Sequence, residues 1–137
     1  MSDPLSITAS ITAVLQLTNA AVSFLKDIKG GSEDRVRLRD EIWSTISLLE
    51  MLKYRVEEAE TGDRHSRWDQ KMSLVGPLNQ LKHLLEKLVS KLAPANRVER
   101  TIQKIMWPFD KNELKEILLT IERQKALFSL AIQDYHV

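Results

Sequence analysis

The sequence predicts an all-α protein: an up-and-down bundle of four long helices with one or two short helices. Helix breakers are rare, with four glycines and four prolines among 137 residues. Long segments repeat apolar residues every three or four positions, and no segment alternates in the manner of a β-strand. The composition, 43% hydrophobic and 28% charged, is that of a globular chain, so we expect residues 1–137 to form a single domain.

The first helix is expected at about residues 4–28, because Pro4 suits a first turn and Gly30 and Gly31 favour a helix end. No side chain from Pro4 to Leu25 is ionisable. Apolar and small residues at alternating spacings of four and three form one stripe, which is expected to pack against the second, third and last helices. The stripe is Ile7, Ile11, Val14, Thr18, Ala21, Leu25 and Ile28.

The second helix is expected at about residues 33–60, with Ser32 as its N-cap and Gly62 beyond its end. Its buried face comprises Ile42, Ile46, Leu49, Leu52 (or Lys53) and Val56, extended by Trp43 and Leu48. The segment that follows predicts only one or two helical turns, anchored by Trp68, Met72 and Val75.

The third helix is expected at about residues 77–92, because a proline after a glycine is typical of a helix start. Its core face is Leu78, Leu81, Leu84, Leu85, Leu88 and Leu92. Pro94 ends it, and a short helix at about 97–106 precedes the tripeptide Trp107, Pro108 and Phe109. We interpret this tripeptide as structural, with its two rings filling a gap between the short and the last helix.

The last helix, at about residues 110–135, has the clearest start in the chain. Asp110 as N-cap and Glu113 three residues later fit a capping box. Short connections favour antiparallel packing of successive helices, hence the up-and-down bundle.

No pattern of an enzyme is present, so we predict no catalytic residue, no cofactor and no metal site. The chain lacks cysteine, a phosphate-binding glycine loop and a dinucleotide-binding fingerprint. His65, His83 and His136 fall on different elements without carboxylates at ligand spacing. The net charge of +1 and the few aromatic residues also argue against nucleic acid as a partner.

A basic flank runs along the third and short helices: Lys82, Lys87, Lys91, Arg97, Arg100 and Lys104. A solvated face balanced by acidic residues on neighbouring helices is the favoured interpretation. Contact with anionic lipid headgroups is the alternative, at roughly 1 kcal/mol per cation near the surface. Trp43 or this flank could equally serve a dimer interface.

Three stretches together resemble the N-terminal HeLo-like domain of fungal STAND (NOD-like receptor) proteins. They are "MSDPLSITASITAVLQLTNAAVSFLKDIKG", "GPLNQLKHLLEKLVSKLAP" and "WPFDKNELKEILLTIERQKALFSLAIQ". The family's motifs correspond to Asp3–Ser6, Gly76–Leu78, Lys91–Pro94 and Trp107–Phe109. Each motif alone is weak, whereas their order and spacing make a specific pattern over almost the whole chain.

The resemblance implies a domain that induces regulated cell death in fungal innate immunity and heterokaryon incompatibility. Relatives oligomerise and then target and permeabilise the membrane through the N-terminal helix. The implied partners are other copies of the chain, membrane lipids, and downstream receptor domains or an amyloid-signalling protein. The implied location is the cytoplasm at rest and the plasma membrane on activation. The alternative is an adaptor or autoinhibitory bundle that acts without a membrane.

The first helix is long enough for this role, since 22 residues reach about 33 Å and the hydrocarbon core is about 30 Å thick. The polar side chains of Gln16, Thr18 and Asn19 lie near its middle and need partners in lipid, so insertion is expected only for an oligomer. The expected insertion residues are Leu5, Ile7, Ile11, Val14, Leu15, Leu17, Val22, Phe24 and Leu25.

Overall fold

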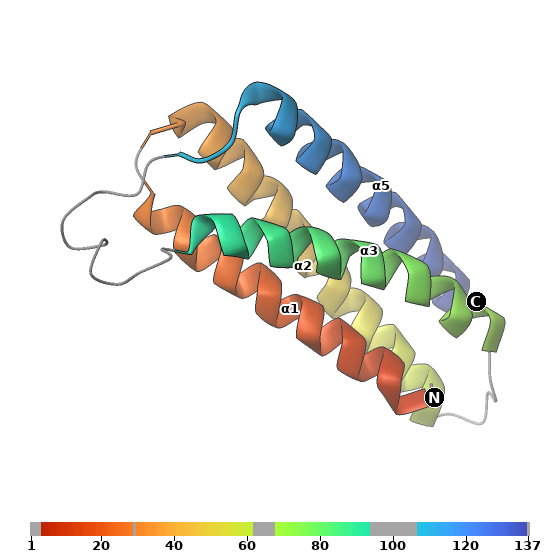
Figure 1. The fold of residues 1–137 in the computed structure, drawn as a ribbon. Helices are drawn as coiled ribbons and strands as arrows, with labels where there is room; N and C mark the ends of the chain where they lie inside the picture. The colour runs from red at the N-terminus through yellow and green to blue at the C-terminus, as the bar shows by residue number, and fades with distance from the viewer. Residues whose placement is uncertain (1–3, 29, 62–67, 94–106, 137) are drawn as a thin grey trace.

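The computed structural model describes residues 4–28, 30–61, 68–93 and 107–136. Within these ranges the chain forms four helices and no strand: α1 (Pro4–Asp27), α2 (Ser32–Thr61), α3 (Trp68–Leu92) and α5 (Lys111–His136). Figure 1 shows that they run alternately in opposite directions along one bundle. The predicted all-α, up-and-down bundle is confirmed, while the short helix expected at 97–106 lies outside the described residues.

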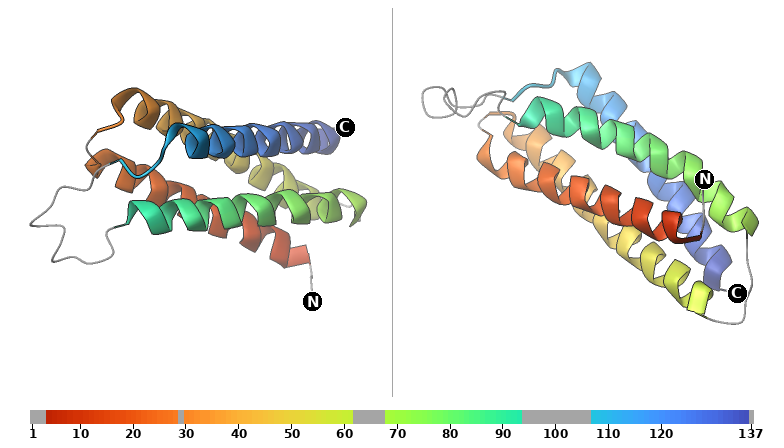
Figure 2. Two further views of the ribbon diagram at one scale, coloured as in Figure 1. Left: turned by 45° about the horizontal axis from the view of Figure 1, so that its top comes forward. Right: turned by 60° about the horizontal axis from the view of Figure 1, so that its bottom comes forward.

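The order of the helices around the bundle differs from the expectation that successive helices are neighbours. α1 packs against α2 and α3, and α5 packs against the same two helices, so α1 lies diagonally across from α5 and α2 across from α3. The two further views in Figure 2 show the same arrangement. α1 and the last helix are therefore not adjacent, although the α1 stripe shares both core clusters with the last helix, as expected. α1 and α3 are instead parallel neighbours, as are α2 and α5.

The length of the α2–α3 connection explains how this order arises. Six residues, 62–67, separate the two helices, and six extended residues reach up to about 20 Å. The diagonal of a bundle whose neighbouring helix axes lie about 10 Å apart is about 14 Å. The connection is long enough to cross the end of the bundle, so its shortness does not force α2 and α3 together.

The core divides into two clusters along the bundle axis, and all four helices contribute to both. The cluster near the N-terminus of α1 contains Ile7, Ile11, Val14, Leu49, Leu52, Val56, Leu74, Leu78, Leu81, Leu85, Phe128, Ala131 and Ile132. The other contains Ala21, Val22, Leu25, Ile28, Leu38, Ile42, Ile46, Leu88, Leu92, Phe109, Leu114, Leu118 and Ile121.

α3 begins at Trp68, nine residues before the start predicted from proline, and Pro77 lies inside it. Pro77 has no N–H to donate, and its ring disfavours a helical conformation of the preceding residue by contact with that residue's Cβ. The preceding residue is Gly76, which has no Cβ. Leu74 and Leu78, on either side of the dipeptide, are both buried. Core packing on both sides therefore holds the helix continuous through the proline.

The starts of α2 and α5 can be compared with the predicted caps. The carbonyl of Gly31 accepts the first helical hydrogen bond of α2, from the N–H of Arg35, so Gly31 and not Ser32 occupies the N-cap position. In α5 the predicted capping box is confirmed. The N–H of Glu113 donates to Asp110 Oδ1 at 2.8 Å, and the N–H of Asp110 donates to Glu113 Oε1 at 3.2 Å.

Trp43 does not extend the buried face of α2, as the sequence suggested. Its side chain is 48% exposed, whereas its neighbour Ile42 is buried. Leu38, which the sequence pattern did not single out, completes the buried stripe one turn before Ile42. α2 thus carries an apolar residue on its outer side that the core does not use.

Candidate functional site

The candidate site is α1 itself, together with the contacts that hold it in the bundle. The predicted stripe from Ile7 to Ile28 is buried at all seven positions, which confirms the spacing argument. Figure 1 shows α1 lying along the surface between α2 and α3, with its N-terminus at the end of the bundle where the C-terminus also lies.

The residues expected to enter a membrane face the protein interior. Ile7, Ile11, Val14, Val22 and Leu25 are buried. Leu15, Leu17 and Phe24 are half-buried and pack against the core clusters. The side chain of Leu5 is outside the described residues. In this structure the apolar surface of α1 is therefore sheltered by the other helices.

The outer side of α1 is uncharged through most of its length. Ala9, Gln16, Asn19 and Ser23 are exposed, and the first charged residue of the helix is Lys26, close to its end. Within the described residues, α1 is the one helix whose length and apolar composition suffice to cross a membrane, over Ile7–Asp27. Core helices of soluble bundles can meet the same requirement. Length and composition alone therefore do not distinguish a membrane-inserting helix from a core helix.

Two threonine side chains of α1 form hydrogen bonds within their own helix. The hydroxyl of Thr18, which is fully buried, donates to the carbonyl of Leu15 at 2.7 Å. The hydroxyl of Thr12 donates to the carbonyl of Thr8 at 3.0 Å. Neither bond links α1 to another helix, and both would persist if α1 moved as an intact helix.

The other three helices are connected by polar side-chain pairs. Lys125 of α5 lies 3.2 Å from Glu41 of α2, and Lys111 lies 3.0 Å from Asp34, also of α2. Gln124 of α5 donates to Gln80 of α3 at 2.6 Å, and a further pair, Lys91 with Glu113, joins the same two helices. α1 is thus fixed mainly by apolar packing, and α5 also by ion pairs and an amide contact.

The connection between α1 and α2 is a turn of two glycines with positive φ, 86° at Gly30 and 56° at Gly31. A Cβ at Gly31 would lie 2.5 Å from the indole ring of Trp107, whereas the nearest atom to a Cβ at Gly30 is 3.8 Å away. Arg35 also donates to the carbonyl of Ile28 at 3.0 Å. Trp107 therefore lies directly on the turn through which α1 would have to move.

The predicted structural role of Trp107, Pro108 and Phe109 concerned a gap beside the short helix, whose residues are outside the described part. The structure gives Trp107 a different contact, the glycine turn. Its ring meets that of Phe109 edge-on, with centroids 5.2 Å apart, and Phe109 is buried in the core. The sequence offered no sign of this contact, because 76 positions separate Gly31 from Trp107.

The described cations of the basic flank divide between two grooves. Lys82 lines a groove between α1 and α3, whereas Lys87 and Lys91 line one between α3 and α5. Arg97, Arg100 and Lys104 lie outside the described residues. The three described lysines thus do not form one continuous cationic surface on α3.

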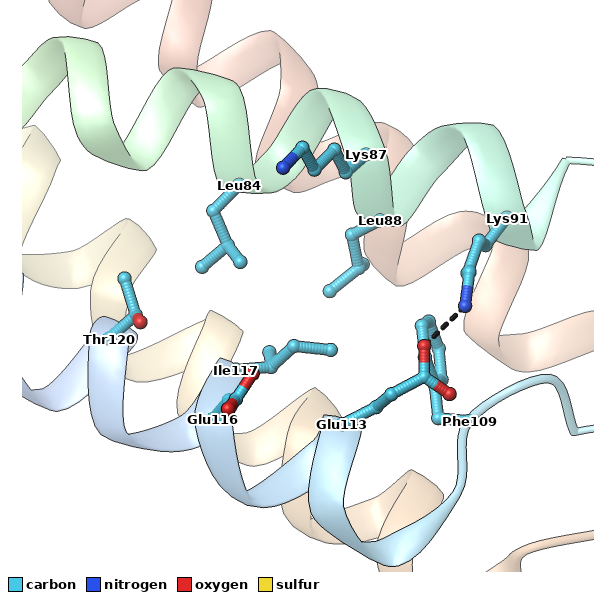
Figure 3. A pocket seen from close by; sticks show the side chains of 9 residues that line it. All are labelled: Leu84, Lys87, Leu88, Lys91, Phe109, Glu113, Glu116, Ile117 and Thr120. Carbon is cyan, nitrogen blue, oxygen red and sulfur yellow. Dashed lines mark hydrogen bonds and ion pairs between the residues drawn. The ribbon is translucent and has the colours of Figure 1, made fainter.

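The groove between α3 and α5 has a volume of about 310 Å³. Figure 3 shows Lys91 pointing at Glu113 across it, and the Lys91 ammonium also lies 5.5 Å from the Phe109 ring centroid. The hydrogen bond from Lys91, aided by the N–H of Asp110, lowers the pKa of Glu113. Glu116 lies in the same groove as Lys87. The groove is therefore close to electrically balanced, and no three metal-ligating side chains cluster within the described residues.

Comparison of the chain with protein-family models, curated proteins and solved structures gave no significant match. The resemblance to the HeLo-like domain therefore stays a hypothesis that depends on the sequence motifs, and the structure contributes the helical bundle.

Proposed function

We propose that this chain is an N-terminal effector domain of a fungal NOD-like receptor, which acts by oligomerisation and insertion of α1 into the plasma membrane to trigger regulated cell death. The observation that carries the proposal is the way in which α1 is held in the bundle, by apolar packing. From Ile7 to Leu25 the helix has no charged side chain, and its hydrogen-bonded side chains in that span bond within the helix. Leaving the bundle would break no ion pair in that span.

Oligomerisation is part of the proposal because a single copy of α1 is poorly suited to lipid. Gln16 and Asn19 are exposed in the bundle, and in a hydrocarbon core their amides need hydrogen-bond partners. Neighbouring copies supply such partners, and small residues such as Ala9 and Ala13 allow close helix contacts. Receptor assembly is the event that brings copies together in the family that the sequence resembles.

The test is release of a trapped dye from phosphatidylserine-containing vesicles by the chain joined to an inducible oligomerisation tag. The variant is Gln16→Lys. Its side chain is exposed, so the bundle should keep its stability. A lysine at the centre of a membrane helix is unfavourable by about 2.5–3.5 kcal/mol, roughly 100-fold in the insertion equilibrium. We expect the wild type to release dye on oligomerisation and Gln16→Lys to release little.

Gln133→Lys is the matched control, since Gln133 is an exposed glutamine of α5 and the substitution adds the same charge elsewhere. It should release dye like the wild type. Charges at Leu15 or Leu17 are less informative because both side chains are half-buried and the variants also disturb the fold. Equal release by Gln16→Lys and wild type contradicts insertion of α1.

The second candidate is an adaptor or autoinhibitory bundle of the same receptor class. The burial of the α1 stripe favours it, because a core helix needs no further role. A folded, oligomeric sample that leaves vesicles intact supports the adaptor.

A further inference from the structure

The turn between α1 and α2 is fastened by two other parts of the chain. Gly30 and Gly31 both have positive φ, and the indole of Trp107 packs on Gly31, where a Cβ would lie 2.5–2.8 Å from three ring atoms. The side chain of Arg35 donates to the carbonyl of Ile28 at 3.0 Å, and its N–H donates to the carbonyl of Gly31. Figures 1 and 2 show the coil before α5 running beside this turn.

The ring of Trp107 is carried by a segment that the rest of the bundle holds in place. Two residues later, Phe109 is buried in the core, and its ring meets the indole edge-on with centroids 5.2 Å apart. The Lys91 ammonium lies 5.5 Å from the centroid of the Phe109 ring. Lys111, the first residue of α5, pairs with Asp34 in the first turn of α2 at 3.0 Å. The indole is therefore a fixed wall against the turn.

Movement of α1 out of the bundle requires rotation at this turn. α1 ends at Asp27 and α2 begins at Ser32, so the backbone between them must absorb any change in the angle between the two helices. Glycines are the residues best able to do so, because they lack a Cβ. The space that a Cβ would need at Gly31 is occupied by the Trp107 ring, so the backbone has no room to turn on that side. The hinge is blocked for as long as the ring stays.

The closed contact also carries a polar cost. The indole Nε1 of Trp107 and the Nε of Arg35 are buried and have no hydrogen-bond partner among the described residues. The indole nitrogen is a donor only, and a buried donor without an acceptor is unfavourable relative to one that water reaches. Apolar packing holds the ring in place, while the unpaired N–H favours its withdrawal into water. The contact is therefore poised to open, which a side chain that only fills the core need not be.

We propose that Trp107 is a latch: its indole, packed on Gly31, keeps the glycine hinge closed and α1 in the bundle, and withdrawal of the ring permits α1 to leave. The inference deepens the proposed function and rests on it for the use to which the release of α1 is put. It adds the place of control, which lies just before α5 and 76 positions along the chain from Gly31. Opening of α1 does not itself require lipid, so it can be measured without a membrane.

The first test is amide hydrogen exchange of the chain in lipid-free solution, read by mass spectrometry. In Trp107→Ala the protection of the α1 amides should fall by about tenfold or more relative to that of the α3 amides, because α1 opens on its own. Phe128→Ala, which truncates a ring buried in the other core cluster, is the control and should lower protection in all four helices alike. Equal loss in all four helices of Trp107→Ala, or no loss, overturns the latch.

A disulfide in place of the ring tests the latch with one chain in two states. A Cβ at Gly30 would lie 3.8 Å from the Cβ of Trp107, a separation typical of a disulfide, and the chain has no cysteine of its own. The variant is Gly30→Cys with Trp107→Cys, joined to the oligomerisation tag. When oxidised it should keep α1 protected and release no dye from phosphatidylserine-containing vesicles. After reduction, the α1 amides should exchange faster and dye should be released.

The two measurements separate the latch from the proposed function. Equal α1 exchange in the oxidised and reduced forms contradicts the latch, even if the wild type releases dye on oligomerisation. Faster α1 exchange on reduction, without release of dye by either the reduced form or the wild type, supports the latch and contradicts insertion of α1 into the membrane.

Discussion

α1 and α5 lie diagonally opposite in the bundle, have similar lengths of 24 and 26 residues, and are held in different ways. Each buries a large side chain completely, Ile11 in α1 and Phe128 in α5. α5 also carries ion pairs to α2 and an amide contact to α3. The hydrogen-bonded side chains of α1 up to Leu25 bond within the helix.

The difference bears on which helix can separate from the others. Removing α5 would strip Lys125 of Glu41, and both side chains are only 20–27% exposed, so their charges would lose a partner in a partly buried place. Separation of α1 exposes apolar surface, which a membrane or another copy can cover. A helix that is uncharged from Ile7 to Leu25 is the one that an environment of low polarity can accept.

The largest expected effect on stability comes from truncating Ile11 or Phe128, the buried side chains compared above. Ile11→Ala should lower the free energy of unfolding by about 2–5 kcal/mol and Phe128→Ala by about 3–5 kcal/mol, from lost burial and the cavity left behind. Amide hydrogen exchange then distinguishes the helices. In Ile11→Ala the amides of α1 should lose more protection than those of α5, whereas Phe128→Ala should weaken all four helices alike. Uniform loss in both variants would show that α1 does not separate on its own.

An intermediate effect is expected at the turn that joins α1 to α2. In Gly31→Ala the alanine must adopt the positive φ of this position, which is unfavourable by about 1–2 kcal/mol for a residue with a Cβ. The added Cβ would also lie 2.5 Å from the indole of Trp107. We expect the free energy of unfolding, measured by urea titration, to fall by at least about 2 kcal/mol, as at other strained glycine positions.

Gly30→Ala is the control, because φ there is also positive but a Cβ would lie 3.8 Å from Trp107. Its destabilisation should be the smaller of the two. Adding Trp107→Ala to Gly31→Ala should restore the part of the stability that is lost through the contact between the new Cβ and the indole ring. If Gly30→Ala and Gly31→Ala are equally destabilised, Trp107 does not restrain the turn.

The smallest expected effect is the pH dependence from the Lys91–Glu113 pair. The pKa of Glu113 is lowered from its ordinary value of 4.5, first by the hydrogen bond from Lys91. A carboxyl with a lowered folded-state pKa stabilises the protein above pH 4.5, and this contribution is lost as the pH falls through the lower, folded-state pKa. The melting temperature of Glu113→Gln should therefore lie below that of the wild type at pH 7 and approach it in acid. A difference that does not change with pH would assign the effect to the capping hydrogen bonds alone.

Local pattern was enough to predict much of this protein. The buried stripe of α1, the capping box at Asp110 and the four-helix composition each depend on residues within a few positions of one another, where helix geometry fixes which side chains share a face. The absence of charge from Pro4 to Leu25 is likewise visible in the sequence.

Tertiary packing decided the rest. Pro77 predicts a helix start, but Leu74 and Leu78 are both drawn into the core and carry α3 through it. Trp43 is apolar yet exposed, because the buried face of α2 was already filled by Leu38 and Ile42. The diagonal placement of α2 and α3 and the contact of Trp107 with Gly31 join residues far apart in the chain. Spacing along one helix carries no information on such contacts, because they depend on which faces the other helices leave open.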